Sequence, residues 1–494
     1  MKKLLLLLIC FSFTVGSATG KIQVKETLVA QMFSPLSFTA KENERYVSVN
    51  EKKNRSFILI DGREKKQYNV IENVFLSPDC RHIAYKALTG DKYCTVVDGE
   101  EGKHYDKIYS GIIFSPDSKH TAYVAAADSK YFVVIDGKEE KHYSDVEIYS
   151  LVFSPDSRSV AYIAREGNRY FAVVDGIEKK RYDYIVKVKQ NYLTFSPDGR
   201  HVAYVAVANN KYFVVVDEKE QKKYNEIVIL SLGFSPDGKR VAYVVDPTEK
   251  HNKYFVVTDG QEGKEYQGIG YPVFSPDSKC MVYAAAYADY WRAVVNGKME
   301  GEYDFSEDFI FSPDSRHLAF TAQKADKYFI VIDGKKQKQC YNIPENPVFS
   351  ADSKHLLYIC KTGKKYFVVI DGKNETKGYD FIKDAVFSPD GKHVAYAAVS
   401  NNKEFVVVDG KEERQYDKIV AHTLVFSQDS KHTAYEAVTD NKLCVVLDGK
   451  EGNKYDNINT YGIGKIFFYS SESLYYLAVK DYGVYLVEER LTED

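Results

Sequence analysis

An aspartate recurs along this 494-residue chain, three residues after a repeated apolar residue. A repeated carboxylate could bind calcium or transfer protons. No copy has the closely spaced Asp and Asn ligands of a calcium loop, and Lys or Arg follows each copy two residues later. Because Asp in a turn normally accepts hydrogen bonds from nearby backbone amides, we expect a structural role. The ten copies are Asp79, Asp117, Asp156, Asp198, Asp237, Asp277, Asp314, Asp352, Asp390 and Asp429.

Histidine follows the same repeat. Seven of the eleven histidines share one position, and these are His82, His120, His201, His317, His355, His393 and His432. A row of imidazoles could bind metal or sense pH. Since neighbouring copies belong to different structural units, we expect them to lie too far apart to share an ion. We therefore predict a residue at the start of a strand, and we expect no metal and no cofactor.

One repeat departs from the others in several positions. Trp291, the only tryptophan, stands where most repeats have Tyr, and Arg292 replaces Phe. Tyr287 and Tyr290 lie beside them. Trp, Tyr and Arg are enriched at binding hot spots. We therefore name Tyr287, Tyr290, Trp291 and Arg292 as candidate partner-binding residues. The competing interpretation is that they form a seam between two domains.

Catalytic signatures are absent from the sequence. It has no Gly-x-Ser-x-Gly elbow, no His-Glu-x-x-His helix and no Gly-rich phosphate loop. We expect no enzyme activity. Two alternatives stay open. Residues from different repeats could form a central-channel site of lyase or lactonase type. The tyrosines, about three per repeat as at Tyr123, Tyr131 and Tyr143, are expected mainly to pack, with a hydroxyl that reaches the rim. A row of such rings could instead bind a glycan.

These residues are positioned by a repeat of about forty residues. Its first-strand apolar residue recurs as Phe114, Phe153, Phe195, Phe234, Phe274, Phe311, Phe349, Phe387 and Phe426. In the copy around Phe114, strands are predicted at 109–114, 121–126 and 131–135. A Ser-Pro-Asp turn follows the first strand, and an Asp136-Gly137 hairpin precedes a fourth strand that carries Tyr143. Four short antiparallel strands per forty residues are typical of a β-propeller blade. The predicted fold class is all-β, with about twelve such units.

The Phe-Ser-Pro-Asp-Gly-Lys pattern at 387–392, with the later Asp-Gly hairpin, resembles the WD40-like β-propeller repeats of the TolB type. These repeats occur in bacterial envelope proteins and in propellers attached to peptidases. The resemblance covers nearly the whole chain after residue 20. It implies a propeller fold but no particular function. TolB itself has a separate amino-terminal α/β domain, for which we find no room here.

Twelve blades exceed the usual four to eight of one ring. We therefore predict two six-bladed propellers, 21–270 and 271–494; five and seven blades, or one ring, remain alternatives. The last repeat lacks a clear fourth strand, and we expect residues 21–28 to supply it.

Residues 1–20 have the pattern of a secretory signal peptide: Lys2 and Lys3, an apolar run and small residues up to Gly20.

The formal net charge is −3, and mixed charges give no basic stripe for nucleic acid. Cys80, Cys94, Cys280, Cys340, Cys360 and Cys444 do not follow the repeat, so we expect unpaired, small apolar thiols. We predict a periplasmic or secreted scaffold that binds an envelope or extracellular protein, with no membrane span after cleavage.

Overall fold

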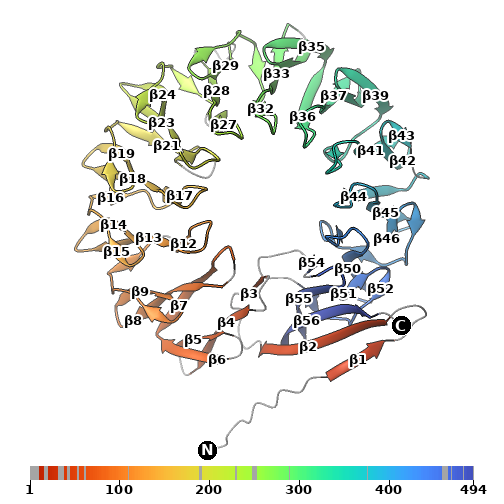
Figure 1. Cartoon of the computed structure of the whole chain (residues 1–494), viewed down its shortest axis with the longest axis horizontal. Helices are drawn as coiled ribbons and strands as arrows, with labels where there is room; N and C mark the ends of the chain where they lie inside the picture. The colour runs from red at the N-terminus through yellow and green to blue at the C-terminus, as the bar shows by residue number, and fades with distance from the viewer. Residues whose placement is uncertain are drawn as a thin grey trace, which may run out of the picture. The chain divides into compact units, whose positions relative to one another are not determined.

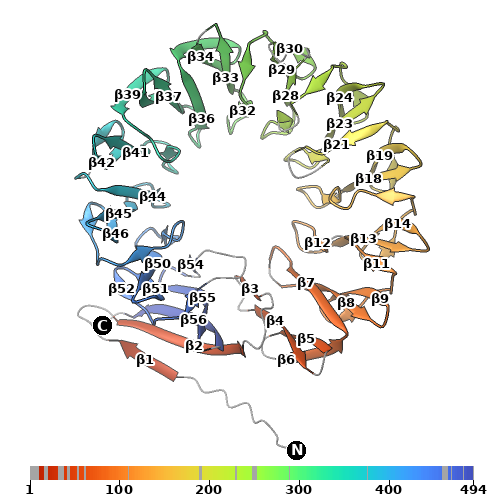
Figure 2. The ribbon, with the colours of Figure 1, turned by 180° about the vertical axis from the view of Figure 1, so that it is seen from behind.

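A computed structural model builds the chain from antiparallel β-strands, with no α-helix in the part of the chain that it describes (Figure 1 and, from behind, Figure 2). That part contains twelve sheets, nearly all of them four strands wide. The predicted fold class, an all-β β-propeller with about twelve four-stranded repeats, is confirmed. The structure describes residues 11–15, 21–31, 38–41, 45–52, 55–60, 63–79, 81–109, 111–188, 192–228, 231–246, 253–288, 290–374, 377–458, 466–468, 470–481 and 483–492.

The second and third strands are the long strands of each repeat. They are β4 (Arg45–Lys52) with β5 (Arg55–Ile60), β8 (Ile83–Thr89) with β9 (Lys92–Val97), β13 (Thr121–Ala127) with β14 (Lys130–Ile135), β18 (Val160–Glu166) with β19 (Arg169–Val174), β23 (Val202–Ala208) with β24 (Lys211–Val216), β28 (Val241–Asp246) with β29 (Phe255–Thr258), β33 (Met281–Tyr287) with β34 (Tyr290–Val295), β37 (Leu318–Lys324) with β38 (Lys327–Ile332), β41 (Leu356–Thr362) with β42 (Lys365–Ile370), β45 (Val394–Ser400) with β46 (Lys403–Val408), β50 (Thr433–Thr439) with β51 (Lys442–Leu447), and β55 (Ser473–Lys480) with β56 (Gly483–Thr492).

The first strand is continuous in some repeats and divided into two short pieces in others. First strands are β3 (Phe38–Lys41), β7 (Val70–Leu76), β11 (Lys107–Ile108) and β12 (Ile113–Phe114), β16 (Asp145–Val146) and β17 (Val152–Phe153), β21 (Tyr184–Val186) and β22 (Thr194–Phe195), β26 (Glu226–Ile227) and β27 (Gly233–Phe234), β31 (Gly268–Ile269) and β32 (Val273–Phe274), β36 (Phe305–Phe311), β40 (Val348–Phe349), β44 (Phe381–Phe387), β48 (Lys418–Ile419) and β49 (Val425–Phe426), and β53 (Asn457–Ile458) and β54 (Phe467–Phe468).

The fourth strand is mostly a two-residue edge. Fourth strands are β6 (Arg63–Tyr68), β10 (Glu100–Glu101), β15 (Lys138–Glu139), β20 (Ile177–Glu178), β25 (Lys219–Glu220), β30 (Gln261–Glu262), β35 (Lys298–Tyr303), β39 (Lys335–Cys340), β43 (Lys373–Asn374), β47 (Lys411–Glu412) and β52 (Lys450–Glu451). Two amino-terminal strands, β1 (Phe11–Val15) and β2 (Lys21–Gln31), join the last sheet.

The chain forms two compact units. Unit 1 comprises Met1–Asn50, Ile58–Lys65 and Lys338–Asp494, and unit 2 comprises Glu51–Phe57 and Lys66–Gln337. In Figure 1 the sheets of unit 2, from β7 in orange to β33 in green, follow one another in chain order along an arc. The predicted division into propellers at residue 270 stays a prediction.

Successive sheets of a unit stack face to face. Between the sheets of β13 and β18, one cluster joins Val124 and Val133 to Tyr143, Tyr162 and Phe171. Tyr143 lies after the short fourth strand, where it forms a single bridge to Tyr131, and it packs edge-on against Phe171 of the next repeat with ring centroids 5.5 Å apart. Each second strand is therefore buried on both faces, which explains apolar runs without alternation such as Val202–Ala208.

The turn aspartates have the structural role predicted. Ser115 Oγ donates to Asp117 Oδ1 at 2.6 Å, and the Lys119 N–H donates to the same oxygen. The bond from Ser115 lowers the pKa of Asp117 to about 2. The Asp117 N–H in turn donates to Ser157 Oγ of the next repeat at 2.9 Å, so these turns also connect neighbouring sheets.

The repeated histidines bind the hairpin aspartates. His120 Nδ1 lies 2.7 Å from Asp136 Oδ2, while the Thr121 N–H donates to Asp136 Oδ1. Asp136 and Gly137 both have positive φ, 48° and 75°, as a type I′ hairpin requires. The carboxylate thus fixes both the hairpin and the start of the second strand. Among the described residues no group of His, Cys, Asp and Glu is arranged to hold a metal ion.

The last sheet is completed by the amino-terminal segment, as predicted. Strand β2 pairs antiparallel with β56, from Lys21 opposite Thr492 to Gln31 opposite Gly483. Ile22 and Val24 are buried against this sheet, and Glu26 accepts hydrogen bonds from Asn453 and Tyr455. Strand β1 pairs with β2, while residues 1–10 and 16–20 of the predicted signal peptide lie outside the described residues.

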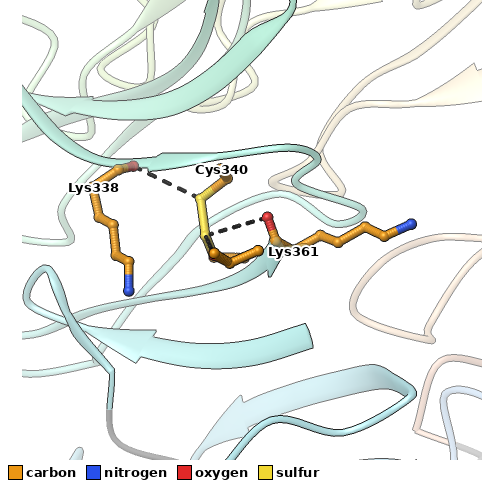
Figure 3. The surroundings of a disulfide bond; sticks show 5 residues. Lys338, Cys340 and Lys361 are labelled. Atoms are coloured by element: carbon orange, nitrogen blue, oxygen red, sulfur yellow. Dashed lines mark hydrogen bonds between the residues drawn. A yellow bond between two sulfur atoms is a disulfide. The ribbon is translucent and has the colours of Figure 1, made fainter. Parts of the chain in front are cut away.

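The expectation that all the cysteines are unpaired thiols is wrong. Cys340 on β39 and Cys360 on β41 form a disulfide, with their Cα atoms 5.5 Å apart, and Cys340 Sγ lies 3.7 Å from the Lys338 carbonyl oxygen (Figure 3). In the regular repeats these two positions hold Tyr143 and Ala164, which pack together across neighbouring sheets. The pair was missed because the two cysteines occupy different positions of the repeat. Cys94, Cys280 and Cys444 are free thiols, and Cys94 and Cys444 are buried.

Candidate functional site

The four candidate binding residues lie on the hairpin of β33 and β34. Tyr287 is opposite Tyr290, Ala286 is opposite Trp291, and Ala285 is opposite Arg292. Because side chains alternate across a strand and opposed residues share a face, Tyr287, Tyr290 and Arg292 lie on one face of the sheet. Trp291 lies on the other face. The structure therefore brings together three of the four residues.

Cations surround the two tyrosines. Lys264 Nζ, from the preceding repeat, lies 4.7 Å from the centroid of the Tyr287 ring, and Arg292 Cζ lies 5.9 Å from the same centroid. Lys324 Nζ, from the following repeat, lies 5.3 Å from the Tyr290 ring. Tyr287 and Tyr290 keep 44% and 37% of their surface exposed. The patch formed by Lys264, Tyr287, Tyr290 and Arg292 is called the Tyr287 patch below.

Arg292 pairs with a glutamate through one end of its guanidinium. Its Nη2 donates to Glu302 Oε1 at 2.8 Å, and 23% of its side chain is exposed. Its Nε is buried and has no hydrogen-bond acceptor in the part of the chain that the structure describes. Regular repeats bury an apolar ring at this position, and Phe132, Phe171 and Phe213 have no exposed surface. At this position the repeat therefore lacks the buried Phe ring and has a guanidinium whose Nε–H has no acceptor among the described residues.

Tyr290 replaces a cation. Most other repeats have Lys or Arg at this position, and in several of them that residue pairs with the aspartate after the repeated tyrosine, as Lys403 does with Asp417 at 2.7 Å. The corresponding aspartate here is Asp304, which accepts a hydrogen bond from the Ala325 N–H. The substitution gives an exposed ring where the repeat normally has an ion pair.

Trp291 has mainly a packing role. Its ring meets Phe305 edge-on at 6.0 Å between centroids, and a Cβ added to Gly268 would lie 3.3 Å from its ring. Trp291 therefore fills the space between its own first strand and the following repeat. Because its ring packs within the chain, Trp291 is a weaker candidate for partner binding. Tyr287, Tyr290 and Arg292 remain candidates.

The repeated tyrosines are less available than expected. The hydroxyls of Tyr143, Tyr162 and Tyr182 are buried, so the expectation that fourth- and second-strand hydroxyls reach a rim is wrong for them. Burial raises the pKa of Tyr143 to about 12. Only third-strand tyrosines such as Tyr131 are partly exposed, which reduces the surface on which a row of tyrosines could bind a glycan.

A second cluster lies in unit 1, in or beside the first strands of three consecutive repeats. His422 Nδ1 lies 2.8 Å from Asp384 Oδ1, and the His422 N–H donates to Asp384 Oδ2 at 3.0 Å. The Asp384 N–H donates to Glu345 Oε1 at 3.1 Å. The His422 side chain is 83% exposed and that of Asp384 only 5%, so a buried carboxylate orients an exposed imidazole.

Electrostatics distinguish the members of this second cluster. Burial raises the pKa of the Glu345 carboxyl, and the hydrogen bond from the Asp384 N–H partly opposes that rise. Asp384 and His422 both have positive φ, 57° and 61°, which is uncommon for residues other than glycine. Beside them, Lys383 pairs with Glu404 at 2.9 Å, which explains why Glu404 replaces a third-strand tyrosine. The cluster was not predicted because Glu345, Asp384 and His422 are different residue types in the irregular segment before or within the first strand, where the repeat has no fixed residue.

Comparisons with known proteins add little about function. No protein-family model and no curated protein match the chain. The solved structure entitled "Crystal structure of the eukaryotic initiation factor" is 14% identical, with a TM-score of 0.34, over 68% of this chain and 96% of that one. The β-propeller domain of the Trilobed protease from Pyrococcus furiosus is 15% identical, with a TM-score of 0.27, over 56% and 98%. The resemblance to TolB-type repeats stays a prediction. In the described part of the chain, no helix is long and apolar enough to cross a membrane.

Proposed function

We propose that this protein is a secreted or periplasmic scaffold, built from TolB-like, WD40-like propeller repeats, that binds another protein through the Tyr287 patch and has no catalytic role. One observation carries the proposal. A single repeat loses the residues that the fold uses elsewhere and presents exposed tyrosines between cations instead. Residues that depart from a repeat without improving its packing point to a contact made outside the chain.

Two observations support the location. Residues 1–20 have the sequence pattern of a signal peptide, and Cys340 and Cys360 form a disulfide. Disulfides persist mainly in oxidising compartments such as the periplasm and the extracellular space. A chain that was purified from such a compartment and began near residue 21 would support this part of the proposal. A chain retained in the cytoplasm with residues 1–20 intact would contradict it.

The decisive variant is provided by the repeat itself. Tyr287→Ala, Tyr290→Lys, Trp291→Tyr and Arg292→Phe together restore the residues found at Ala127, Lys130, Tyr131 and Phe132. Because this variant matches a regular repeat, we expect it to fold. We would cross-link native envelope extract to residues 21–494 of both forms and compare the captured proteins. A partner lost from the variant supports the scaffold, and a partner captured equally by both would place the contact elsewhere. No specific partner for either form would contradict the scaffold.

The second cluster favours a second candidate function, a propeller enzyme. An imidazole oriented by a buried carboxylate can act as a general base, and a nearby carboxyl with a raised pKa can act as an acid. The test is lactone hydrolysis and elimination from uronate polymers by the wild type, His422→Ala and His432→Ala. His432 is the matched control, because it is a repeated histidine paired with Asp448. Activity lost only in His422→Ala would support the enzyme, and no turnover by the wild type would reject these two reactions.

A further inference from the structure

The outer strands of unit 2 are connected by a ladder of ion pairs. In five consecutive repeats a lysine two residues before the repeated tyrosine at the end of the repeat binds a glutamate on the outer strand of the next repeat, at 2.6 to 2.8 Å. The pairs are Lys66–Glu101, Lys103–Glu139, Lys141–Glu178, Lys180–Glu220 and Lys222–Glu262. The glutamate is always the second residue after the hairpin glycine or its replacement. The ladder thus gives each of these lysines a carboxylate partner.

The ladder breaks at the Tyr287 patch. Lys264 occupies the lysine position of the next step, but the glutamate position holds Met299. The register confirms the match, because Met299 is opposite Val294 as Glu139 is opposite Val134. Met299 packs instead against the apolar cluster that contains Tyr266 and Val294. Within the described ranges, Lys264 has no carboxylate partner, and its ammonium lies over the exposed Tyr287 ring.

Two cations therefore meet at one exposed ring. Lys264 is exposed, and Arg292 reaches the same ring while it has a buried Nε without an acceptor. A carboxylate placed beside Tyr287 would give Lys264 the partner that the ladder provides elsewhere. Charge-assisted hydrogen bonds of this kind are stronger than neutral ones, and the flanking rings of Tyr287 and Tyr290 could contact the apolar parts of the same ligand.

We propose that the Tyr287 patch binds an acidic peptide segment, in which an Asp or Glu of the partner replaces the glutamate missing from the ladder at Met299. This inference rests on the proposed scaffold function and names the chemistry of its partner. A peptide is favoured over other anions because exposed Tyr287 and Tyr290 flank the cations, and aromatic residues with Arg are typical of protein-binding hot spots.

The test uses a fluorescent decapeptide with alternating Glu and Tyr, and the same peptide with Gln for Glu. Fluorescence anisotropy measures their binding to residues 21–494. We expect the wild type to bind the Glu peptide about tenfold more tightly than the Gln peptide, and Met299→Glu and Lys264→Gln to lose that preference. Met299→Glu restores the regular repeat, so a melting curve like that of the wild type would exclude misfolding. Lys103→Gln, at an intact ladder step, should change nothing.

Each other outcome overturns the inference. It fails if the wild type ignores both peptides, prefers neither, or if Met299→Glu binds as the wild type does. Binding of polygalacturonate but not of the peptide, lost in Lys264→Gln, would identify a carboxylated glycan as the occupant instead. The scaffold proposal survives these failures if the four-residue variant still loses its captured protein. The two proposals are therefore tested separately.

Discussion

The repeats at β16–β20 and β31–β35 have the same strand order but use the same positions differently. In the first, Phe171 is fully buried and Lys141 from the preceding repeat binds Glu178. In the second, the corresponding positions hold Arg292, Lys264 and Met299. At these positions the first repeat buries an apolar ring and gives the preceding lysine a carboxylate partner, whereas the second has a guanidinium in place of the ring and no glutamate for Lys264. The strand framework tolerates this loss because Met299 and Trp291 still fill the spaces between sheets.

The largest effect should come from breaking the regular repeat. Phe171→Ala removes a fully buried ring from the contact with Tyr143. We expect it to lower the free energy of unfolding by about 3 to 5 kcal/mol, measured by urea denaturation. Arg292→Ala is the matched change in the departing repeat and should cost much less. Equal losses would show that the two repeats are packed alike.

The last sheet, which contains β56, differs from both repeats because it buries a carboxyl group, that of Glu489. Glu489 on β56 is fully buried, and one oxygen accepts a hydrogen bond from Tyr476. Burial raises the pKa of Glu489 to about 8, above its ordinary value. The protonated form is favoured by folding, so the stabilisation is complete below about pH 4.5 and is lost as the pH rises through about 8.

The expected loss between pH 5 and pH 9 is on the order of 4 kcal/mol, measured as denaturation midpoints across that range. Glu489→Gln cannot ionise and should show a much flatter profile. A mutant with the same alkaline loss as the wild type would assign that loss to other groups.

The disulfide offers a further contrast with regular packing. Cys340→Ser with Cys360→Ser removes the bond between β39 and β41, and we expect unfolding to become easier by about 3 kcal/mol. Cys94→Ser, at a buried free thiol, is the comparison that separates loss of the crosslink from loss of sulfur. If dithiothreitol left the wild-type melting temperature unchanged, the crosslink would have no stabilising role.

The smallest expected effect is a gain. Arg292→Phe restores the buried ring of the regular repeat and should raise the free energy of unfolding by about 1 kcal/mol. The same change should weaken partner binding. Calorimetric melting and the capture experiment measure the two effects on one protein. A destabilised Arg292→Phe would show that Arg292 is needed for the fold.

Much of the fold was predictable because each repeat carries its own local signals. The Asp136-Gly137 hairpin, the Ser-Pro-Asp turn and the missing fourth strand supplied by residues 21–28 are all found. The disulfide was not, because Cys340 and Cys360 become neighbours only when a fourth strand is placed against the next second strand. Aligning Cys340 with Tyr143 and Cys360 with Ala164 would have revealed it.

The candidate sites were predictable to different degrees. Tyr287, Tyr290 and Arg292 could be found from the sequence because they depart from the repeat. That Trp291 lies on the opposite face of the sheet could be assigned only from the strand register. The cluster of Glu345, Asp384 and His422 was not predicted, because its members are three different residue types that do not form a recognisable motif, although they are spaced 39 and 38 residues apart. Departures at repeated positions can be found from sequence, whereas contacts between irregular segments need coordinates.

The pairing of β2 with β56 determines when folding can finish. Tyr455 donates a hydrogen bond to Glu26 across 429 residues of chain, so this sheet cannot form on a ribosome or at an export channel until nearly all of the polypeptide has emerged. Contacts of such sequence separation form slowly. During synthesis the edge of β2 remains open to chaperones and proteases, and a chain interrupted before β56 has no strand with which to cover it.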